Sequence, residues 1–193
     1  MTINNDIYYI NLIIEGNTKA FSVLVDRYKD LVFSLALKMV KNREEAEEVS
    51  QDTFIKAYRS LHQFKGDSKF STWIYKVTYN TCLDRLKKNK REQFVESIDE
   101  FNLNQIRCLD NALNAMENKE REQAIQDCIQ LLPADDAFLL TLFYFEEQSL
   151  EEISKVLGLT PNNVKVKLFR CRRKLTSILR EKLEPELIEY YES

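Results

Sequence analysis

The sequence has few of the residues that build tight turns and phosphate-binding loops. Its 193 residues include 3 glycines, 3 prolines and 1 histidine. Hairpins and the glycine-rich loops of nucleotide-binding folds need glycine at special backbone angles. An all-β fold, a Rossmann domain and a P-loop enzyme are therefore poorly supported, and the composition favours an all-α protein.

The sequence also lacks the usual patterns of metal and disulfide sites. Four cysteines are spread along the chain with no C-x-x-C pair, at Cys82, Cys108, Cys128 and Cys171. The single histidine, His62, follows Arg59 by three positions, so the paired Glu-x-x-His motifs of di-metal helical bundles are absent. We expect reduced thiols, no metal, no cofactor and no catalytic residue.

Long apolar runs are missing as well. No stretch approaches the roughly 20 apolar residues that span a bilayer. Met1 to Ile14 has neither the basic start nor the small-residue cleavage site of an export signal. The expected location is the cytoplasm, without membrane insertion.

Charge is distributed unevenly along the chain. The totals are 28 Lys and Arg against 31 Asp and Glu, a net charge of −3, which alone argues against a nucleic-acid binder. Residues 65–91, however, hold 8 basic against 2 acidic side chains (net +6), and residues 161–183 hold 8 against 1 (net +7). Two basic segments predict two contacts with one polyanion, and solvated helix faces are the alternative.

Hydrophobic periodicity predicts an all-α fold of two small helical domains joined by an acidic linker. Helices are expected over 17–40, 42–61 and 71–91, a short one around 113–129, and further ones after Pro133, over 150–157 and over 161–183. Residues 92–130 hold 3 basic against 9 acidic residues and read as linker. The predicted units are a first domain (1–91), the linker (92–130), a second domain (131–183) and an acidic tail (184–193).

The last predicted helix has two chemically different faces. At about 100° per residue, an apolar stripe expected to face the core contains Val164, Leu168, Cys171 and Leu175. The opposite face carries Asn162, Val166, Phe169, Arg170 and Arg173, flanked by Lys165, Lys167, Arg172 and Lys174. Arginine pairs with guanine, asparagine with adenine, and apolar side chains meet thymine methyl groups in the major groove.

The residues before this helix support the same interpretation. Gly158 ends the preceding short helix, and Thr160 with Pro161 forms an N-cap followed by a first-turn proline. Two helices joined by such a turn predict a helix-turn-helix that reads duplex DNA. An ordinary surface helix is the alternative.

The third predicted helix presents a different surface. Two apolar sides are formed by Phe70, Ile74 and Val77 and by Tyr75, Tyr79, Leu83 and Leu86. A narrow stripe remains, made of Lys69, Trp73, Lys76, Asn80 and Lys87. An aromatic ring among Lys and Asn suits single-stranded DNA, because bases stack on it while the cations neutralise phosphates. The alternative is that Trp73 is an ordinary core residue.

Several dense motifs, in order, resemble the sigma-70 superfamily. In the first domain they are REEAEEVSQDTF (43–54), FKGDSKFSTWIY (64–75) and Asn80 with Asp84-Arg85. In the second they are LLP (131–133), SLEEIS (149–154), LGL (157–159), NVK (163–165) and RCRRKL (170–175). The resemblance covers 15–91 and 131–182, and the chain of two domains is most similar to the extracytoplasmic-function (ECF) group.

The resemblance implies a bacterial initiation factor that binds core RNA polymerase, directs it to promoters and helps to open them, without catalysing a reaction itself. Contacts with the coiled coil of the largest polymerase subunit are expected at Glu48, Gln51, Asp52 and Lys56, whereas Glu44 and Glu45 fit equally well as a dipole-favoured helix start. The second domain would meet the polymerase flap, and the linker would run toward the active centre. An anti-sigma factor is a further partner that the family allows.

The resemblance also assigns DNA contacts. The loop from Lys65 to Phe70 would capture a flipped minus-10 base. The full minus-10 set is Lys65, Asp67, Ser68, Lys69, Phe70, Trp73, Lys76, Asn80 and Lys87. The minus-35 set is Asn162, Asn163, Lys165, Val166, Lys167, Phe169, Arg170, Arg173 and Lys174. Val166 and Phe169 depart from the polar residues common there, so no promoter sequence is implied.

One other DNA-binding function fits part of the chain. The second domain alone would allow a stand-alone helix-turn-helix regulator that binds DNA without polymerase. The first domain argues against it. The two functions differ in whether the protein shifts promoter duplex unaided or only with core polymerase.

Overall fold

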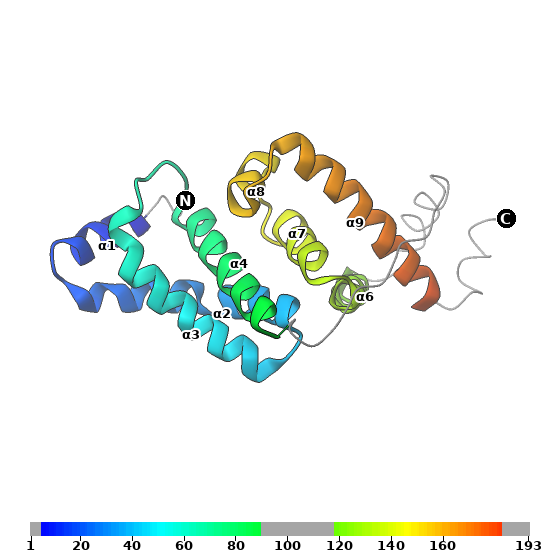
Figure 1. Cartoon of the computed structure of the whole chain (residues 1–193), viewed down its shortest axis with the longest axis horizontal. Coiled ribbons are helices and arrows are strands. Elements are labelled where there is room, and N and C mark those ends of the chain that lie inside the picture. The colour runs from blue at the N-terminus through cyan, green and yellow to red at the C-terminus, as the bar shows by residue number, and fades with distance from the viewer. Residues whose placement is uncertain (1–4, 90–117, 183–193) are drawn as a thin grey trace.

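The structure is a computed structural model that describes residues 5–89 and 118–182, and these residues form helices with no β-strand. The first helical group contains α1 (Asn5–Ile14), η1 (Thr18–Ala20), α2 (Phe21–Val40), α3 (Arg43–Ser60), η2 (Leu61–Gln63) and α4 (Phe70–Asn89). The second helical group contains α6 (Asn118–Leu131), α7 (Ala134–Tyr144), α8 (Leu150–Leu157) and α9 (Pro161–Lys182). The two groups lie side by side, the first on the left of Figure 1. The predicted all-α fold of two helical units is confirmed.

Helix starts follow from local side-chain chemistry. The side chain of Asn42 accepts a hydrogen bond from the Glu45 backbone N–H at 3.0 Å and begins α3, whose first turn carries the favourable acidic residues Glu44 and Glu45. Ser149 and Glu152 form a reciprocal capping box at the start of α8. These caps explain why the sequence located both helices closely.

Helix α1 was not predicted. Its Asp6 carboxylate is buried, and it accepts hydrogen bonds from the Tyr28 hydroxyl at 2.7 Å and from Arg27, both on α2. Ile10 and Ile13 pack into the core from the same helix. A contact between residues more than 20 positions apart has no signature in local periodicity, so it could not be predicted from the sequence.

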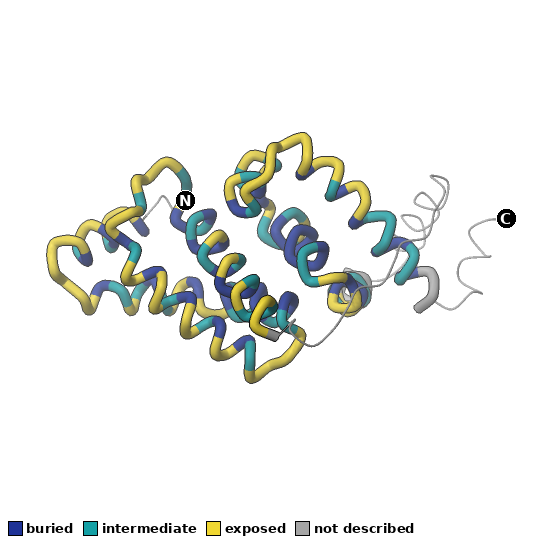
Figure 2. Tube along the Cα trace, in the orientation of Figure 1, coloured by how far each residue is buried: buried dark blue, intermediate teal, exposed yellow. Residues whose placement is uncertain are grey.

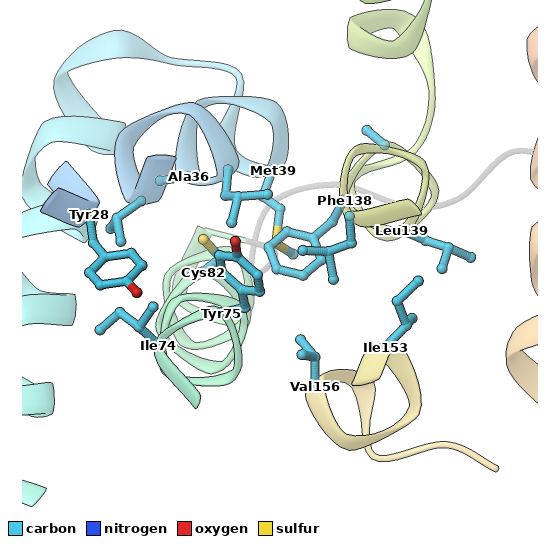
Figure 3. Close-up of a cluster of buried hydrophobic side chains, with 14 of the residues drawn as sticks. Tyr28, Ala36, Met39, Ile74, Tyr75, Cys82, Phe138, Leu139, Ile153 and Val156 are labelled. Atoms are coloured by element: carbon cyan, nitrogen blue, oxygen red, sulfur yellow. The ribbon is translucent and has the colours of Figure 1, made fainter. Parts of the chain in front are cut away.

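The two helical groups share one continuous hydrophobic core. Helix α4 contacts α8, and α2 contacts α7. Figure 2 shows buried residues along the facing sides of both groups, and Figure 3 shows Met39 and Tyr75 of the first group beside Phe138 of the second. The sequence predicted two separately folded parts, whereas the structure packs them directly against each other.

Most predicted boundaries agree with the structure to within a few residues. The helix expected from 17 begins as η1 and continues as α2, and the one expected over 161–183 is α9. The short helix expected around 113–129 corresponds to α6, which begins at Asn118 in the described part of the chain. Most of the predicted acidic linker and the whole tail 184–193 lie outside the described residues.

Candidate nucleic-acid interface

Helices α8 and α9 form the predicted helix-turn-helix. The turn depends on Gly158, which has φ of +68° in the left-handed region that only glycine enters without strain. The Thr160 hydroxyl then caps α9 by accepting from the Asn163 backbone N–H at 3.3 Å, and Pro161 is the first helical residue. Sequence and structure therefore agree on how this motif is built.

The faces of α9 are divided as the periodicity predicts. The four stripe residues Val164, Leu168, Cys171 and Leu175 are all buried. On the outer side, Val166 and Phe169 each keep 44% of their surface exposed. Arg170, on the same side of the helix, is also exposed. Exposed apolar side chains among cations have no role in solubility, and they suit contacts with base edges in a groove.

One edge of α9 is tied to α7 by ion pairs. The Lys174 ammonium lies 2.7 Å from the Asp136 carboxylate, and Lys167 lies 3.7 Å from Asp135. Arg172 stacks over the rings of Phe143 and Tyr144 at 5.2 and 5.5 Å. These contacts orient α9. Sequence reasoning missed the two aspartates, although two consecutive acidic residues near a basic helix were an available signal.

The structure therefore divides the predicted minus-35 residues into two kinds. The exposed ones are Asn162, Asn163, Lys165, Val166, Phe169 and Arg170. Those partly covered by the protein itself are Lys167, Arg173 and Lys174. Lys167 and Lys174 reach DNA only if they leave their carboxylate partners.

The predicted minus-10 residues lie on the loop before α4 and along that helix. Gly66, with φ of +78°, turns the loop. Six of the nine residues are exposed, namely Lys65, Asp67, Lys69, Lys76, Asn80 and Lys87, and Ser68 is half-buried. The narrow polar stripe expected along this helix is therefore present on its surface.

Phe70 and Trp73 form an aromatic cluster with Phe64. The ring centroids of Phe64 and Trp73 lie 5.7 Å apart, and those of Phe70 and Trp73 lie 5.5 Å apart. Phe70 is only 2% exposed, so it supports the loop from the core and does not touch a strand in this conformation. Trp73 is half-buried, with part of its ring packed and part on the surface.

The four predicted polymerase contacts share an exposed face of α3. Glu48, Gln51, Asp52 and Lys56 are all exposed. Two of them pair with α4: Lys56 lies 3.0 Å from Asp84, and Glu48 accepts a hydrogen bond from Arg85. Such exposed pairs are weak and easily exchanged for a partner's charges.

Two apolar residues that sequence reasoning missed extend this face. Ile55 is 48% exposed and Tyr58 is 40% exposed, at helical spacing from Gln51 and Asp52. Tyr58 borders a shallow hollow of about 570 Å³ that is also lined by Phe21 and Lys19. Exposed apolar residues beside acidic ones are a common feature of protein-binding surfaces. The spacing of Ile55 along the acidic helix was the sequence signal that could have identified it.

The described residues offer little for metal or thiol chemistry. No cluster of His, Cys, Asp and Glu within residues 5–89 and 118–182 has a metal-binding arrangement. Burial raises the pKa of Cys82 and of Cys171 to about 12 in each case, so neither is a reactive thiolate. No helix in the described ranges is long and apolar enough to cross a bilayer.

Two family models match the chain, one in each helical group. The model of Sigma-70 region 2 matches residues 24–92, and the model of Sigma-70, region 4 matches residues 122–175. The first match covers α3, the loop before α4 and α4 itself, and the second covers the helix-turn-helix.

Solved structures share the fold. The sigma factor RpoE in complex with the anti-sigma factor NepR from Bartonella quintana aligns with a TM-score of 0.60 at 20% identity, over 85% of this chain and 99% of that one. CnrH in complex with the cytosolic domain of CnrY aligns with a TM-score of 0.57 at 21% identity, over 93% and 99%.

Curated relatives match over nearly their whole length. The ECF RNA polymerase sigma factor SigW of Bacillus subtilis is 32% identical over 86% of this chain and 92% of its own. The RNA polymerase sigma-H factor of Pseudomonas aeruginosa is 31% identical over 93% and 96%, and the ECF sigma-E factor of Escherichia coli is 34% identical over 82% and 85%. With both regions matched in order, this chain belongs to the sigma-70 family, in its extracytoplasmic-function group.

Proposed function

We propose that this alternative sigma factor divides promoter recognition between its two helical groups. Its function is to direct RNA polymerase to promoters for transcription initiation, as its family membership establishes. In the proposal, the first group holds the minus-10 strand and the second reads the minus-35 duplex. The polymerase supplies the catalysis and the chain carries out none. Because the bacterial chromosome that it helps to transcribe lies in the cytoplasm, the cytoplasm is the proposed location.

The exposed face of α9 is the observation that carries the proposal for the minus-35 element. Val166 and Phe169 stay on the surface although they are apolar, and Arg170 lies among them. In the major groove, Arg170 would pair with guanine, and the two apolar side chains would contact thymine methyl groups. Lys165 would bind a phosphate, which adds affinity without sequence information.

The minus-10 element is assigned to α4 and the loop before it. Lys76, Asn80 and Lys87 are exposed along one side of the helix and would follow the displaced strand. The half-buried ring of Trp73 offers a stacking surface, and the loop containing Lys65 would hold a flipped base. Linking two weak contacts on one DNA molecule raises the overall affinity.

The exposed face of α3 is proposed to dock on the coiled coil of the largest polymerase subunit. Glu48, Gln51, Asp52 and Lys56 supply polar contacts, and Ile55 with Tyr58 supplies an apolar centre. The second helical group would meet the polymerase flap. An anti-sigma factor stays a prediction for this chain, because the two solved complexes describe such partners for other proteins.

Reconstituted transcription tests the proposal. Core polymerase is mixed with the purified protein and a fragmented genomic library from its host, and the 5′ ends of the transcripts are mapped. We expect defined start sites that are absent with core polymerase alone and share two upstream sequence elements. Transcripts that start at no defined position would refute the function.

A second measurement separates the sigma factor from a stand-alone regulator. Promoter duplex taken from those start sites is titrated with the protein alone and with the holoenzyme. A sigma factor binds tightly only with core polymerase, whereas a stand-alone helix-turn-helix protein binds equally well without it. The family match and the exposed face of α3 favour the first result.

A further inference from the structure

The loop before α4 is closed at its base by aromatic rings. Phe64 stands before this loop and Phe70 after it, and their ring centroids lie 5.7 Å apart in an edge-to-face arrangement. The ring of Trp73 contacts both of them. Exposed residues assigned to the minus-10 strand, such as Lys65 and Lys69, lie between the two phenylalanines. The positions of these rings therefore help to set the shape of the loop.

Tyr28 of α2 supports these rings from inside the core. Its ring centroid lies 5.4 Å from that of Phe70, edge to face, and Figure 3 shows Tyr28 on the side of α2 that faces α4. The Tyr28 hydroxyl donates to the Asp6 carboxylate of α1 at 2.7 Å. Burial, together with this hydrogen bond, raises the pKa of Tyr28, so the hydroxyl keeps its proton and remains a donor. Because edge-to-face contacts are directional, a fixed Tyr28 ring also fixes Phe70.

Helix α1 holds Tyr28 through a buried carboxylate. Asp6 is 8% exposed, and its second donor is Arg27, which also stacks over the ring of Tyr9 at 5.9 Å. A buried carboxylate costs free energy unless donors surround it, so these two donors favour one position of α1. The same helix contacts η2, which ends one residue before Phe64. Helix α1 therefore supports both ends of the loop, one through Tyr28 and the other through η2.

None of the roles assigned above uses α1. The model of Sigma-70 region 2 matches from residue 24, so it includes Tyr28 and Phe70 but not Asp6. A loop that is ordered before binding loses less conformational entropy when its ligand arrives. A single strand that binds the loop would therefore bind more tightly when the rings keep the loop in one shape.

We propose that Asp6 and Tyr28 are positioning residues for the minus-10 strand. They act through Phe70, and neither of them touches DNA. The proposal rests on the function proposed above, because that function assigns the strand to the loop before α4. The hydrogen bond between Asp6 and Tyr28 orders the aromatic rings, and the rings order the loop before the strand arrives.

Tryptophan fluorescence tests the ordering of the rings directly. Trp73 is the single tryptophan of the chain, so acrylamide quenching in the free protein measures how far this ring cluster opens to solvent. Tyr28→Phe removes only the hydroxyl, and we expect it to raise the quenching constant of Trp73. The matched control is Tyr79→Phe, which loses a hydrogen bond to the Asp135 carboxylate at 3.3 Å farther along α4. That variant should leave the quenching unchanged.

Strand binding by the holoenzyme tests the consequence. The probe is a single-stranded oligonucleotide with the non-template minus-10 sequence of a mapped promoter. Tyr28→Phe and Asp6→Ala should each weaken its binding about fivefold, which corresponds to about 1 kcal/mol. The double variant should lose no more than either single variant, because both changes remove the same hydrogen bond. Asp6→Asn keeps an acceptor oxygen for the hydroxyl and should lose less than Asp6→Ala.

The outcomes separate the positioning role from the function on which it rests. If wild-type holoenzyme binds this strand no better than one of scrambled sequence, the proposed function of the loop fails, and Trp73 quenching still decides whether Tyr28 orders the rings. Unchanged quenching or unchanged strand binding in Tyr28→Phe would overturn the positioning role. An equal loss of strand binding in Tyr79→Phe would overturn it as well, because the effect would then be a general loosening of the fold. Urea unfolding checks that each variant is folded under the assay conditions.

Discussion

Replacing Lys174 by methionine should weaken the fold, whereas the same replacement four residues earlier, at Arg170, should weaken promoter binding. Lys174 lies 2.7 Å from Asp136, whose side chain is 11% exposed. Lys174→Met keeps the aliphatic stem and leaves that carboxylate without its ammonium. Arg170 is exposed on the outer face of the same helix.

The magnitude follows from the lost hydrogen bond. A hydrogen bond to a charged group contributes about 1.5–3 kcal/mol. Asp136 lies in the first turn of α7, whose dipole still favours a carboxylate by about 0.3–1 kcal/mol, and the Cys171 thiol also bonds to it. We therefore expect a loss of about 1.5 kcal/mol for Lys174→Met, and a change within about 0.5 kcal/mol for Arg170→Met.

Urea unfolding and promoter binding separate the two variants. With a denaturant slope of about 2 kcal/mol/M, the midpoint of Lys174→Met should fall by roughly 0.7 M. Arg170→Met should unfold like the wild type but lose about 1–3 kcal/mol at promoters that depend on the upstream element. Pairing Lys174→Met with Asp136→Asn in a double-mutant cycle isolates the contact.

Two results would refute the reasoning. Equal urea midpoints for wild type and Lys174→Met would mean that Asp136 does not need this cation. A large loss of stability in Arg170→Met, with promoter binding unchanged in the folded fraction, would mean that the assigned face of α9 is wrong.

Three further predictions concern the helix cap, the tryptophan and the thiols. Ser149→Ala removes the side chain that accepts from the Glu152 backbone N–H at 3.2 Å, and urea unfolding should show a loss of about 1 kcal/mol. Trp73→Ala should impair transcription more on linear duplex than on a pre-melted template, since the ring is assigned to strand separation, whereas Trp73→Phe should retain much of the packing. Because burial raises the pKa of Cys82 and Cys171 to about 12, mass spectrometry should find both unmodified by iodoacetamide at pH 8 in native protein and modified in urea.

Each of these predictions has an outcome that contradicts it. An unchanged midpoint in Ser149→Ala would show that the cap does not stabilise α8. Equal losses on both templates would make Trp73 purely a core residue. Rapid alkylation of Cys82 in native protein would show that α4 opens far more often than its burial implies.

The sequence predicted α9 and its faces because one helix carries all the necessary signals. Thr160 and Pro161 mark the start, and the stripe that includes Val164 and Leu168 has the period of a helix buried on one side. The exposed positions of Val166 and Phe169 follow from the same period. Local chemistry and geometry were sufficient here because the helix packs on one face only.

The docking of the two groups could not be predicted in the same way. Helix α7 is buried at every position from Asp136 to Leu142, so it has no polar face to indicate its orientation. Such a helix must be covered on more than one side: α9 covers one and α2 of the other group covers another. Its apolar run from Ala137 to Phe143, which only Thr141 interrupts, signalled this need, but only the three-dimensional structure identifies α2 as the cover.

The placement of carboxylates explains how an acidic protein can keep basic surfaces exposed. Asp135 and Asp136 neutralise the inner edge of α9, and Glu152 faces Lys69 in the loop before α4. The outward cations, such as Arg170 and Lys76, remain exposed. Nonspecific affinity for DNA follows the number of phosphates that cations neutralise and not the net charge, which is −3 here. Glu152 pairs with Lys69, and Asp135 and Asp136 pair with Lys167 and Lys174, so the carboxylates that orient the helices also reduce the number of cations that are free to bind phosphates.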